Sequence, residues 1–248
     1  MRQLLAPILA QEELWPGASL LWVETPPLEM EPGQFFMVGC GEGALLRRPL
    51  SIHQAVPGRM AFLFQVRGRG TAWLSGRRPG EALDLLGPLG RGFALAPQSK
   101  MVLLAAGGMG VAPLAFLTQR AREKGLGVVL LHGARDRSRL YPPGLLPPGV
   151  DYVPITEDGS AGRKGLLTQH LKEFTPQADQ VMACGPGDMY RSMAKMTDLG
   201  KAQVSLEVRM GCGFGVCLGC TIPTHQGPRR ACRDGPVFPL DEVLWQHP

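Results

Sequence analysis

The N-terminal part of the chain is a series of short apolar or alternating segments that end at turn signals. Pro-Gly and Pro-Pro dipeptides separate several of these segments, as at 26–27, 32–33, 57–58 and 79–80. We expect strands at residues 1–10, 19–25, 34–38, 46–52, 60–67 and 82–86, and a helix that begins near Thr71. Short strands with recurring turn signals are typical of an antiparallel barrel or sandwich. Residues 1–98 are therefore predicted to form one such β domain.

The hydrophobic pattern changes at Lys100. An uninterrupted apolar run at residues 101–106 is typical of a buried strand in a parallel sheet. The turn G-G-M-G at 107–110 follows, and then a helical pattern from Val111 to about Lys124. Further strands are expected at 128–131, 151–156, 180–183 and 204–208, and helices at 166–174 and 189–199. This alternation predicts an open parallel α/β sheet over residues 99–205, with ligands at the carboxyl ends of its strands.

Four cysteines gather in the C-terminal part of the chain. Cys212, Cys217, Cys220 and Cys232 have the spacing C-x4-C-x2-C-x11-C, which matches the plant-type arrangement of four thiolates around a [2Fe–2S] cluster. Glycines alternate with the first three cysteines, so the backbone can approach the inorganic sulfides and direct N–H groups at the sulfurs. We therefore predict a small [2Fe–2S] domain over residues 206–248, with these four cysteines as metal ligands.

Two other interpretations of the cysteines stay open at this stage. Structural zinc sites made of four cysteines usually combine two short C-x2-C pairs, and here only Cys217 and Cys220 form one. Disulfides are disfavoured in a reducing cytosol. Colour separates these interpretations, because flavin and iron–sulfur groups absorb visible light whereas zinc does not.

Composition limits the classes of function. The 248 residues suffice for two domains and a small third one, and the 44% of hydrophobic residues allow well-packed cores. The net charge of +5 is mild, and no stripe of basic residues with interleaved aromatics indicates nucleic-acid binding. No stretch approaches the roughly 18 apolar residues that a membrane span needs. We expect a cytoplasmic protein whose C-terminal thiols bind metal.

Three short motifs are suited to a phosphorylated cofactor. R-P-L-S at 48–51 combines a cation, a rigid proline and a hydroxyl, and G-R-G-T at 68–71 opens a predicted helix whose N–H groups could hold a phosphate. The turn at 107–110 lacks a full G-x-G-x-x-G fingerprint, because Pro113 stands where the third glycine belongs. A shorter glycine turn before a helix still suits a pyrophosphate. By itself, R-P-L-S is more often a strand edge with a solvated arginine and G-R-G-T more often a hairpin, whereas the turn at 107–110 is about as often an ordinary strand–helix turn without a ligand.

Together, the β domain, the α/β sheet and the cysteine loop resemble the ferredoxin–NADP reductase superfamily, in which a barrel holds flavin and the α/β domain holds nicotinamide. The resemblance implies FAD binding at Arg48, Pro49, Leu50, Ser51, Leu63, Phe64, Gln65, Gly70 and Thr71. Leu50 stands where many members have a tyrosine. The resemblance also implies NAD binding at Gly107, Gly108, Gly110, Cys184, Gly185 and Pro186.

Within this superfamily, the motifs are most similar to those of the electron-transfer subunits of type B dihydroorotate dehydrogenases. They are R-R-P-L-S-I (47–52), R-G-R-G-T (67–71), L-L-A-A-G-G-M-G-V-A-P (103–113), M-A-C-G-P-G-D-M (182–189), E-V-R-M-G-C-G-F-G-V-C-L-G-C (207–220) and A-C-R-D-G-P-V-F (231–238). The likeness implies an FMN-containing catalytic partner that oxidises dihydroorotate in pyrimidine biosynthesis, in a heterotetramer of two catalytic and two electron-transfer chains. Electrons would then pass through [2Fe–2S] and FAD to NAD+.

Two rival functions remain at the level of sequence. A reductase subunit of a hydrogenase or sulfite reductase would share the flavin and the cluster. The R-G-R-G-T motif favours the dihydroorotate-linked function, as does Cys212, because some related subunits have an aspartate as first cluster ligand. The second rival, a zinc-stabilised binding module without redox function, belongs to a different class.

Overall fold

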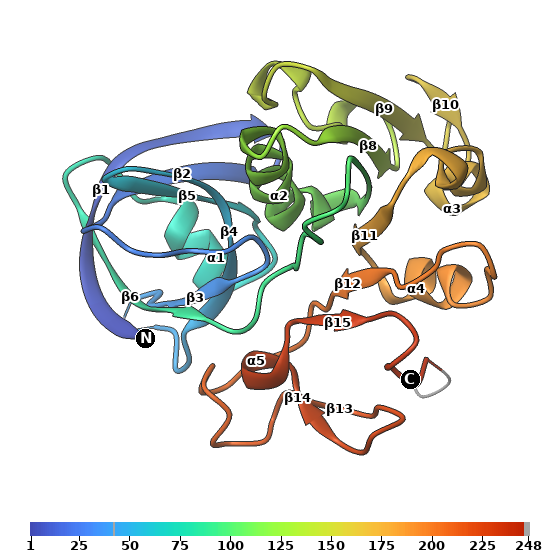
Figure 1. Ribbon diagram of the computed structural model, residues 1–248. Coiled ribbons are helices and arrows are strands. Elements are labelled where there is room, and N and C mark those ends of the chain that lie inside the picture. Colours follow the sequence, from blue (N-terminus) through green and yellow to red (C-terminus); the bar gives the residue numbers. More distant parts are fainter. Residues whose placement is uncertain (42, 246–248) are drawn as a thin grey trace.

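The N-terminal strands form a closed barrel of antiparallel neighbours (Figure 1). The structure, a computed structural model, describes residues 1–41 and 43–245. Around the barrel, the strand order is β1-β2-β5-β4-β3-β6, and helix α1 (Arg69–Ser75) connects β5 to β6. The predicted barrel and the helix near Thr71 are confirmed. The strands are β1 (Arg2–Trp15), β2 (Ala18–Glu24), β3 (Phe35–Val38), β4 (Arg48–Val56), β5 (Arg59–Gln65) and β6 (Ala82–Leu89).

Alternating burial and one long strand explain how the barrel closes. In β6, Leu83 and Leu85 are buried in the barrel core, and Asp84 between them is partly exposed. The first half of β1 pairs with β6 and the second half with β2. Register shifts near Ile8 and Glu13 allow β1 to bend between its two partners. Closure pairs the strand edges that an open sheet would expose.

The next part of the chain forms an α/β sheet in the order β10-β9-β8-β7-β11-β12-β15. Its neighbouring strands are parallel except for β12 with β15. Strands β7 and β8 are almost entirely apolar and buried, as expected for strands covered on both faces. The strands are β7 (Met101–Gly107), β8 (Gly127–Ala134), β9 (Val150–Thr156), β10 (Arg163–Lys164), β11 (Gln180–Cys184), β12 (Gln203–Ser205) and β15 (Val237–Pro239).

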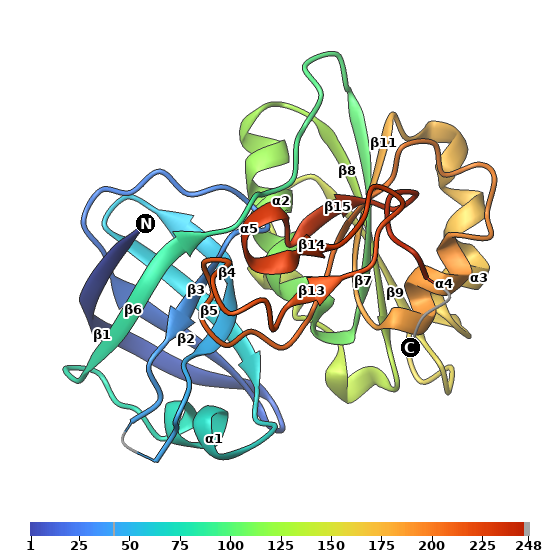
Figure 2. The same ribbon diagram turned by 90° about the horizontal axis from the view of Figure 1, so that it is seen from below.

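The direction of the strand order reverses between β7 and β11. From β7 the chain moves outward through β8, β9 and β10, and β11 then pairs with the other side of β7. Helix α2 (Val111–Glu123) covers one face of the sheet and α4 (Gly187–Met193) the other (Figure 2). Ligands of open α/β sheets bind at such a reversal, beyond the carboxyl ends of the strands. The turns that follow β7 and β11 meet at this point.

Helix α2 has the predicted length, but the later helices are shorter than predicted. Helix α3 (Leu167–His170) gives way to 3-10 turns, the last of which contains Pro176; the residue before a proline disfavours helical backbone. After α4 ends, the chain turns and brings Leu199 back into the core. None of the helices in the described residues is long and apolar enough to span a membrane.

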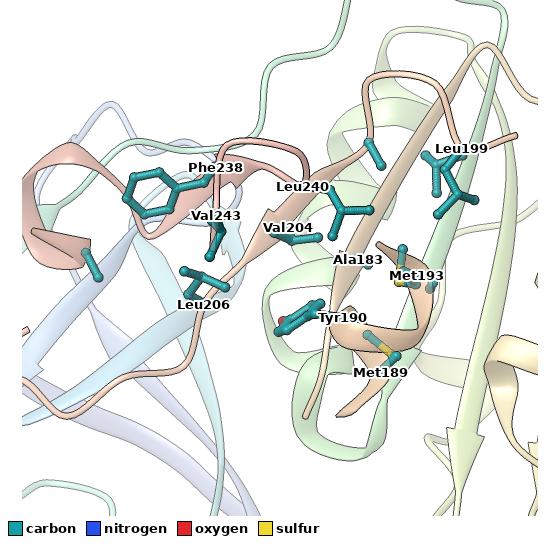
Figure 3. Packing of buried hydrophobic residues seen from close by; sticks show 14 of the residues in the cluster. Ala183, Met189, Tyr190, Met193, Leu199, Val204, Leu206, Phe238, Leu240 and Val243 are labelled. Carbon is teal, nitrogen blue, oxygen red and sulfur yellow. The ribbon is translucent and has the colours of Figure 1, made fainter. Parts of the chain in front are cut away.

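The C-terminal segment leaves the sheet and then returns to it. It contains β13 (Thr221–Ile222), β14 (Arg229–Arg230) and α5 (Ala231–Asp234) before β15. Phe238 of β15 lies opposite Val204 of β12 and shares a hydrophobic cluster with Tyr190 of α4 (Figure 3). On the barrel side, a Cβ atom at Gly213 would overlap the Met37 side chain. The cysteine loop is therefore held between the barrel and the sheet.

Candidate cofactor sites

A cavity of about 650 Å³ lies where the barrel meets the segment that follows β12. The start of α2 contributes Ala112 and Pro113 to its wall, and residues 205–210 also line it. A concave, largely apolar site with a few polar groups suits an aromatic cofactor that carries phosphates. The barrel brings together here most of the residues predicted for FAD: Arg48, Pro49, Leu50, Ser51, Leu63, Phe64, Gln65 and Thr71.

Gly70, the remaining residue predicted for FAD, lies behind the cavity wall. A Cβ atom there would come within 2.9 Å of Arg48 Nε and 3.3 Å of Cys40 Cβ. Glycine therefore lets the Arg48 side chain pass close to the turn that opens α1. Thr71 Oγ1 accepts a hydrogen bond from the N–H of Arg67 at 2.8 Å, so the protein's own hydroxyl fixes the shape of this turn.

A second cavity, of about 510 Å³, lies beyond the carboxyl ends of β7 and β11. It is lined by four of the residues predicted for NAD, namely Gly107, Gly108, Gly185 and Pro186. A Cβ atom at Gly107 would come within 2.7 Å of the Pro186 ring. A Cβ atom at Gly185 would in turn lie 3.0 Å from the Gly107 Cα, so glycine on both turns lets them approach each other.

The other two residues predicted for NAD lie beneath this cavity and contact each other. A Cβ atom at Gly110 would overlap the carbonyl of Cys184. The Cys184 side chain is 1% exposed, and burial raises the pKa of its thiol well above the ordinary value. Gly110 and Cys184 therefore set how closely the turn after β7 packs on the end of β11.

The two cavities adjoin each other. Arg67, Met109 and Glu207 line both of them. Desolvation by the surrounding protein raises the pKa of the Glu207 carboxyl, an effect that the Arg67 guanidinium opposes. A ligand in one cavity would thus lie next to a ligand in the other.

The four C-terminal cysteines come together as two pairs. The sulfurs of Cys220 and Cys232 lie 3.2 Å apart and both residues are buried. The thiol of Cys217 lies close enough to that of Cys212 to help lower its pKa, and Cys217 is exposed. A Cβ atom at Gly211 would lie 3.3 Å from the Cys217 sulfur. As the sequence predicted, the backbone comes close to these sulfurs.

The surroundings of the thiols differ between the pairs. Desolvation raises the pKa of the Cys212 thiol, but the backbone N–H groups of Cys217, Phe214 and Val216 outweigh it and lower this pKa to about 6. Desolvation raises the pKa of the Cys232 thiol to about 12, with a further contribution from neighbouring Cys220. Four thiolates in this loop would therefore require a cationic group among them.

The arrangement of the thiols fits a two-iron cluster. In a [2Fe–2S] cluster ligated by four cysteines, the ligands are shared between two irons, and the thiols here stand two and two. All six cysteines are free in the structure.

Comparison with known proteins identifies the family. Residues 207–244 match the iron–sulfur cluster binding domain of dihydroorotate dehydrogenase B. The chain is 42% identical to the dihydroorotate dehydrogenase B (NAD(+)) electron transfer subunit of Desulforamulus reducens, over 87% of each chain. The chain belongs to this family. The corresponding subunit of Caldanaerobacter subterraneus is 38% identical over 86% of this chain and 87% of its own.

Solved structures of other reductases share the fold of this chain. A structure of the NADH-dependent reduced ferredoxin–NADP oxidoreductase superposes with a TM-score of 0.88 at 27% identity, covering 98% of this chain and 90% of that chain. A ferredoxin–NADP+ reductase from Neisseria gonorrhoeae shares the fold, with a TM-score of 0.68 at 21% identity over 81% of this chain and 92% of that chain.

Family membership confirms the predicted class of protein. The chain is the electron-transfer component of an NAD-linked oxidoreductase, it acts with a catalytic partner subunit, and it carries an iron–sulfur cluster binding domain. The zinc-stabilised binding module without redox function is thereby set aside.

Sequence reasoning missed the residues that join the two cavities. Met109 lies inside the turn at 107–110, of which only the three glycines were predicted to contact NAD. Glu207 and Arg209 have the alternation of an exposed strand, but the strand ends at Ser205 and residues 206–210 line the larger cavity instead. The sequence did contain one indication of this role, because residues 206–210 end only two positions before the predicted cluster ligand Cys212.

Proposed function

We propose that this chain takes electrons from an FMN-containing catalytic chain that oxidises dihydroorotate, and delivers them through [2Fe–2S] and FAD to NAD+ in pyrimidine biosynthesis. One observation carries the proposal: residues 205–210 line the larger cavity and lead directly into the loop of Cys212, while the smaller cavity adjoins the larger one. The order cluster, flavin, nicotinamide is thus the order of the three sites. Flavin connects one-electron and hydride chemistry.

The site residues follow the same proposal. Cys212, Cys217, Cys220 and Cys232 hold the cluster, the cavity residues of the barrel hold FAD with Gly70 behind Arg48, and the turns after β7 and β11 hold NAD. Three domains would carry these sites, at residues 1–98, 99–205 and 206–248, with β15 joining the third to the sheet of the second. Six free cysteines suit the reducing cytoplasm, where we place the complex.

Arg48→Ala is expected to weaken FAD binding by about tenfold or more, because hydrogen bonds to charged groups contribute about 1.5–3 kcal/mol. Arg48 is the barrel cation of the R-P-L-S motif and lines the larger cavity. Fluorescence titration of the apoprotein with FAD measures the effect. Arg59→Ala is the matched control, because its guanidinium lies over Trp22, 5.0 Å from the ring centre, and Arg59 does not line this cavity. Equal losses in both variants would contradict the assignment.

The catalytic partner is proposed to dock on the cysteine loop. Three apolar residues of the cysteine loop, Phe214, Val216 and Leu218, are 42%, 73% and 60% exposed. Apolar side chains exposed together on one loop mark an interaction surface, and docking here would bring the partner next to the cluster. We propose an assembly of two catalytic and two electron-transfer chains.

Val216→Lys is expected to weaken association with the catalytic chain by about tenfold or more, because an unpaired charge would be buried in the interface. Leu5→Lys is the control, because Leu5 is 75% exposed on β1. Its neighbour on the adjacent strand is Asp84, whose carboxylate can pair with the new lysine. Biolayer interferometry with the purified catalytic chain gives both dissociation constants. The same affinity in the two variants would move the docking surface elsewhere.

Reconstitution tests the proposed function as a whole. The chain is co-expressed with a candidate dihydroorotate dehydrogenase catalytic chain and purified without oxygen, and iron, FAD and the visible spectrum are measured. We expect two irons and one FAD per chain, with NADH formed from dihydroorotate only when both chains are present. Cofactors without dihydroorotate-dependent NADH would redirect the search to a hydrogenase or sulfite reductase donor. A colourless protein containing zinc would overturn the proposal.

A further inference from the structure

Two buried histidines hold the two ends of the turn between the cavities. His53 lies on β4 of the barrel and His132 on β8 of the sheet, and both are 0% exposed. His132 Nε2 lies 3.1 Å from the carbonyl oxygen of Gly108. His53 Nδ1 lies 2.9 Å from the carbonyl oxygen of Ala112. The turn from Gly108 to Ala112 is thus held from both domains.

Tyr141 links the two histidines. Its backbone N–H donates to His132 Nδ1 at 3.1 Å, and its hydroxyl lies 3.0 Å from His53 Nε2. The Tyr141 side chain is 0% exposed, and its ring meets the His53 imidazole edge-on with the ring centres 5.5 Å apart. Tyr152 donates its hydroxyl to the Tyr141 carbonyl at 3.1 Å, which fixes the backbone of the linking residue.

The partners determine where each imidazole carries its proton. A carbonyl oxygen can only accept, so His132 carries its proton on Nε2 and His53 carries its proton on Nδ1. A backbone N–H can only donate, so His132 Nδ1 is an acceptor and the ring is neutral. His53 Nε2 then accepts from the Tyr141 hydroxyl. Burial lowers the pKa of both histidines to about 4, against the opposing effect of the carbonyl each one contacts.

The clamped turn borders both cofactor cavities. Gly108 lines the smaller cavity, Ala112 the larger, and Met109 between them lines both. Gly108 has a φ of +54° with open space around its Cα, so the turn itself does little to hold this residue in place. The hydrogen bond from His132 holds the carbonyl group of Gly108 in place.

We propose that His53, Tyr141 and His132 form a clamp with fixed tautomers that positions the Gly108–Ala112 turn and thereby aligns the nicotinamide against the flavin. This inference rests on the proposed function, because it concerns the cavities assigned there to FAD and NAD. The three side chains line neither cavity. They are positioning residues, and their effect reaches the cofactors through the turn.

Tyr141→Phe is expected to slow flavin reduction by NADH about fivefold, because it removes the one neutral hydrogen bond between the Tyr141 hydroxyl and His53. His132→Leu is expected to slow it by at least as much, because it removes the bonds to both Gly108 and Tyr141. Stopped-flow absorbance of the assembled complex gives this rate constant, and FAD content is expected to stay at the wild-type value. His132→Gln is expected to recover most of the rate, because its amide N–H can donate to the Gly108 carbonyl. His225→Leu, at an exposed histidine of the C-terminal segment, is the control and is expected to keep the wild-type rate.

Histidine tautomers provide a second readout that does not depend on turnover. Nitrogen NMR of the complex with labelled histidine is expected to show His132 protonated at Nε2 and His53 at Nδ1, each assigned by its disappearance in a variant. The opposite tautomer at either position would overturn the clamp. Wild-type rates in both Tyr141→Phe and His132→Leu would overturn its role in alignment while the proposed function stands. If wild-type flavin is not reduced by NADH, the proposed function fails, and with it the alignment that the clamp would serve.

Discussion

Cys220→Ser is expected to lower dihydroorotate-dependent reduction of NAD+ in the assembled complex by more than about 100-fold. Substituting even a residue that only supports a metal ligand typically costs about 10–100-fold, and a hydroxyl is a poorer ligand than thiolate for an iron–sulfur cluster. Cys220 is 3% exposed and its sulfur lies 3.2 Å from that of Cys232, so the serine hydroxyl would take the place of the thiol inside the ligand set. Iron analysis and the electron paramagnetic resonance signal of the reduced protein report the loss of the cluster.

The same variant separates the cluster from the rest of the route. The cavities proposed for FAD and NAD do not include Cys220, so reduction of an artificial dye by NADH through the flavin is expected to persist. Cys217→Ser gives a second test, because Cys217 is exposed and its substitution disturbs the core less. Cys40→Ser is the control, since the Cys40 thiol donates to the Val38 carbonyl at 3.4 Å within the barrel. Full dihydroorotate-linked activity in Cys220→Ser would rule out Cys220 as a ligand.

Local patterns in the sequence predicted those parts of the molecule whose structure depends on residues close together in the chain. The apolar run before Gly107 predicted a buried strand, and the spacing from Cys212 to Cys232 predicted an iron–sulfur loop. The predicted strand at 204–208 was too long, because Leu206 and the residues after it leave the sheet to line a cavity against the barrel. That contact joins residues far apart in the chain, and hydrophobic periodicity does not record it.

The histidine clamp is a second feature that local patterns in the sequence did not predict. His53 and His132 are separated by 79 positions and follow no metal-binding or catalytic spacing. His132 is the single polar residue of β8, whereas His53 stands in β4 beside other polar residues such as Gln54. Tyr141 directly precedes two prolines, outside any regular helix or strand. Their common function as a clamp depends on three elements that meet only when the barrel packs on α2.

Gly110→Ala is expected to destabilise the protein by about 3 kcal/mol or more and to weaken NADH binding by more than about tenfold. Gly110 has ordinary helical backbone angles, with φ −58° and ψ −14°, so the cost is steric. The new Cβ would overlap the carbonyl of Cys184, and a backbone carbonyl cannot rotate away as a side chain can. The turn after β7 and the end of β11 would have to separate, which would open the smaller cavity.

Gly108→Ala is the matched control for this prediction, because it changes the same turn for a different physical reason. Space around Gly108 is open, and only its φ of +54° opposes a side chain, which costs about 1–2 kcal/mol. Thermal unfolding and a titration with NADH compare the two variants. A larger loss of stability in Gly110→Ala would show that close packing of the two turns limits this site; a larger loss in Gly108→Ala would show that backbone conformation does.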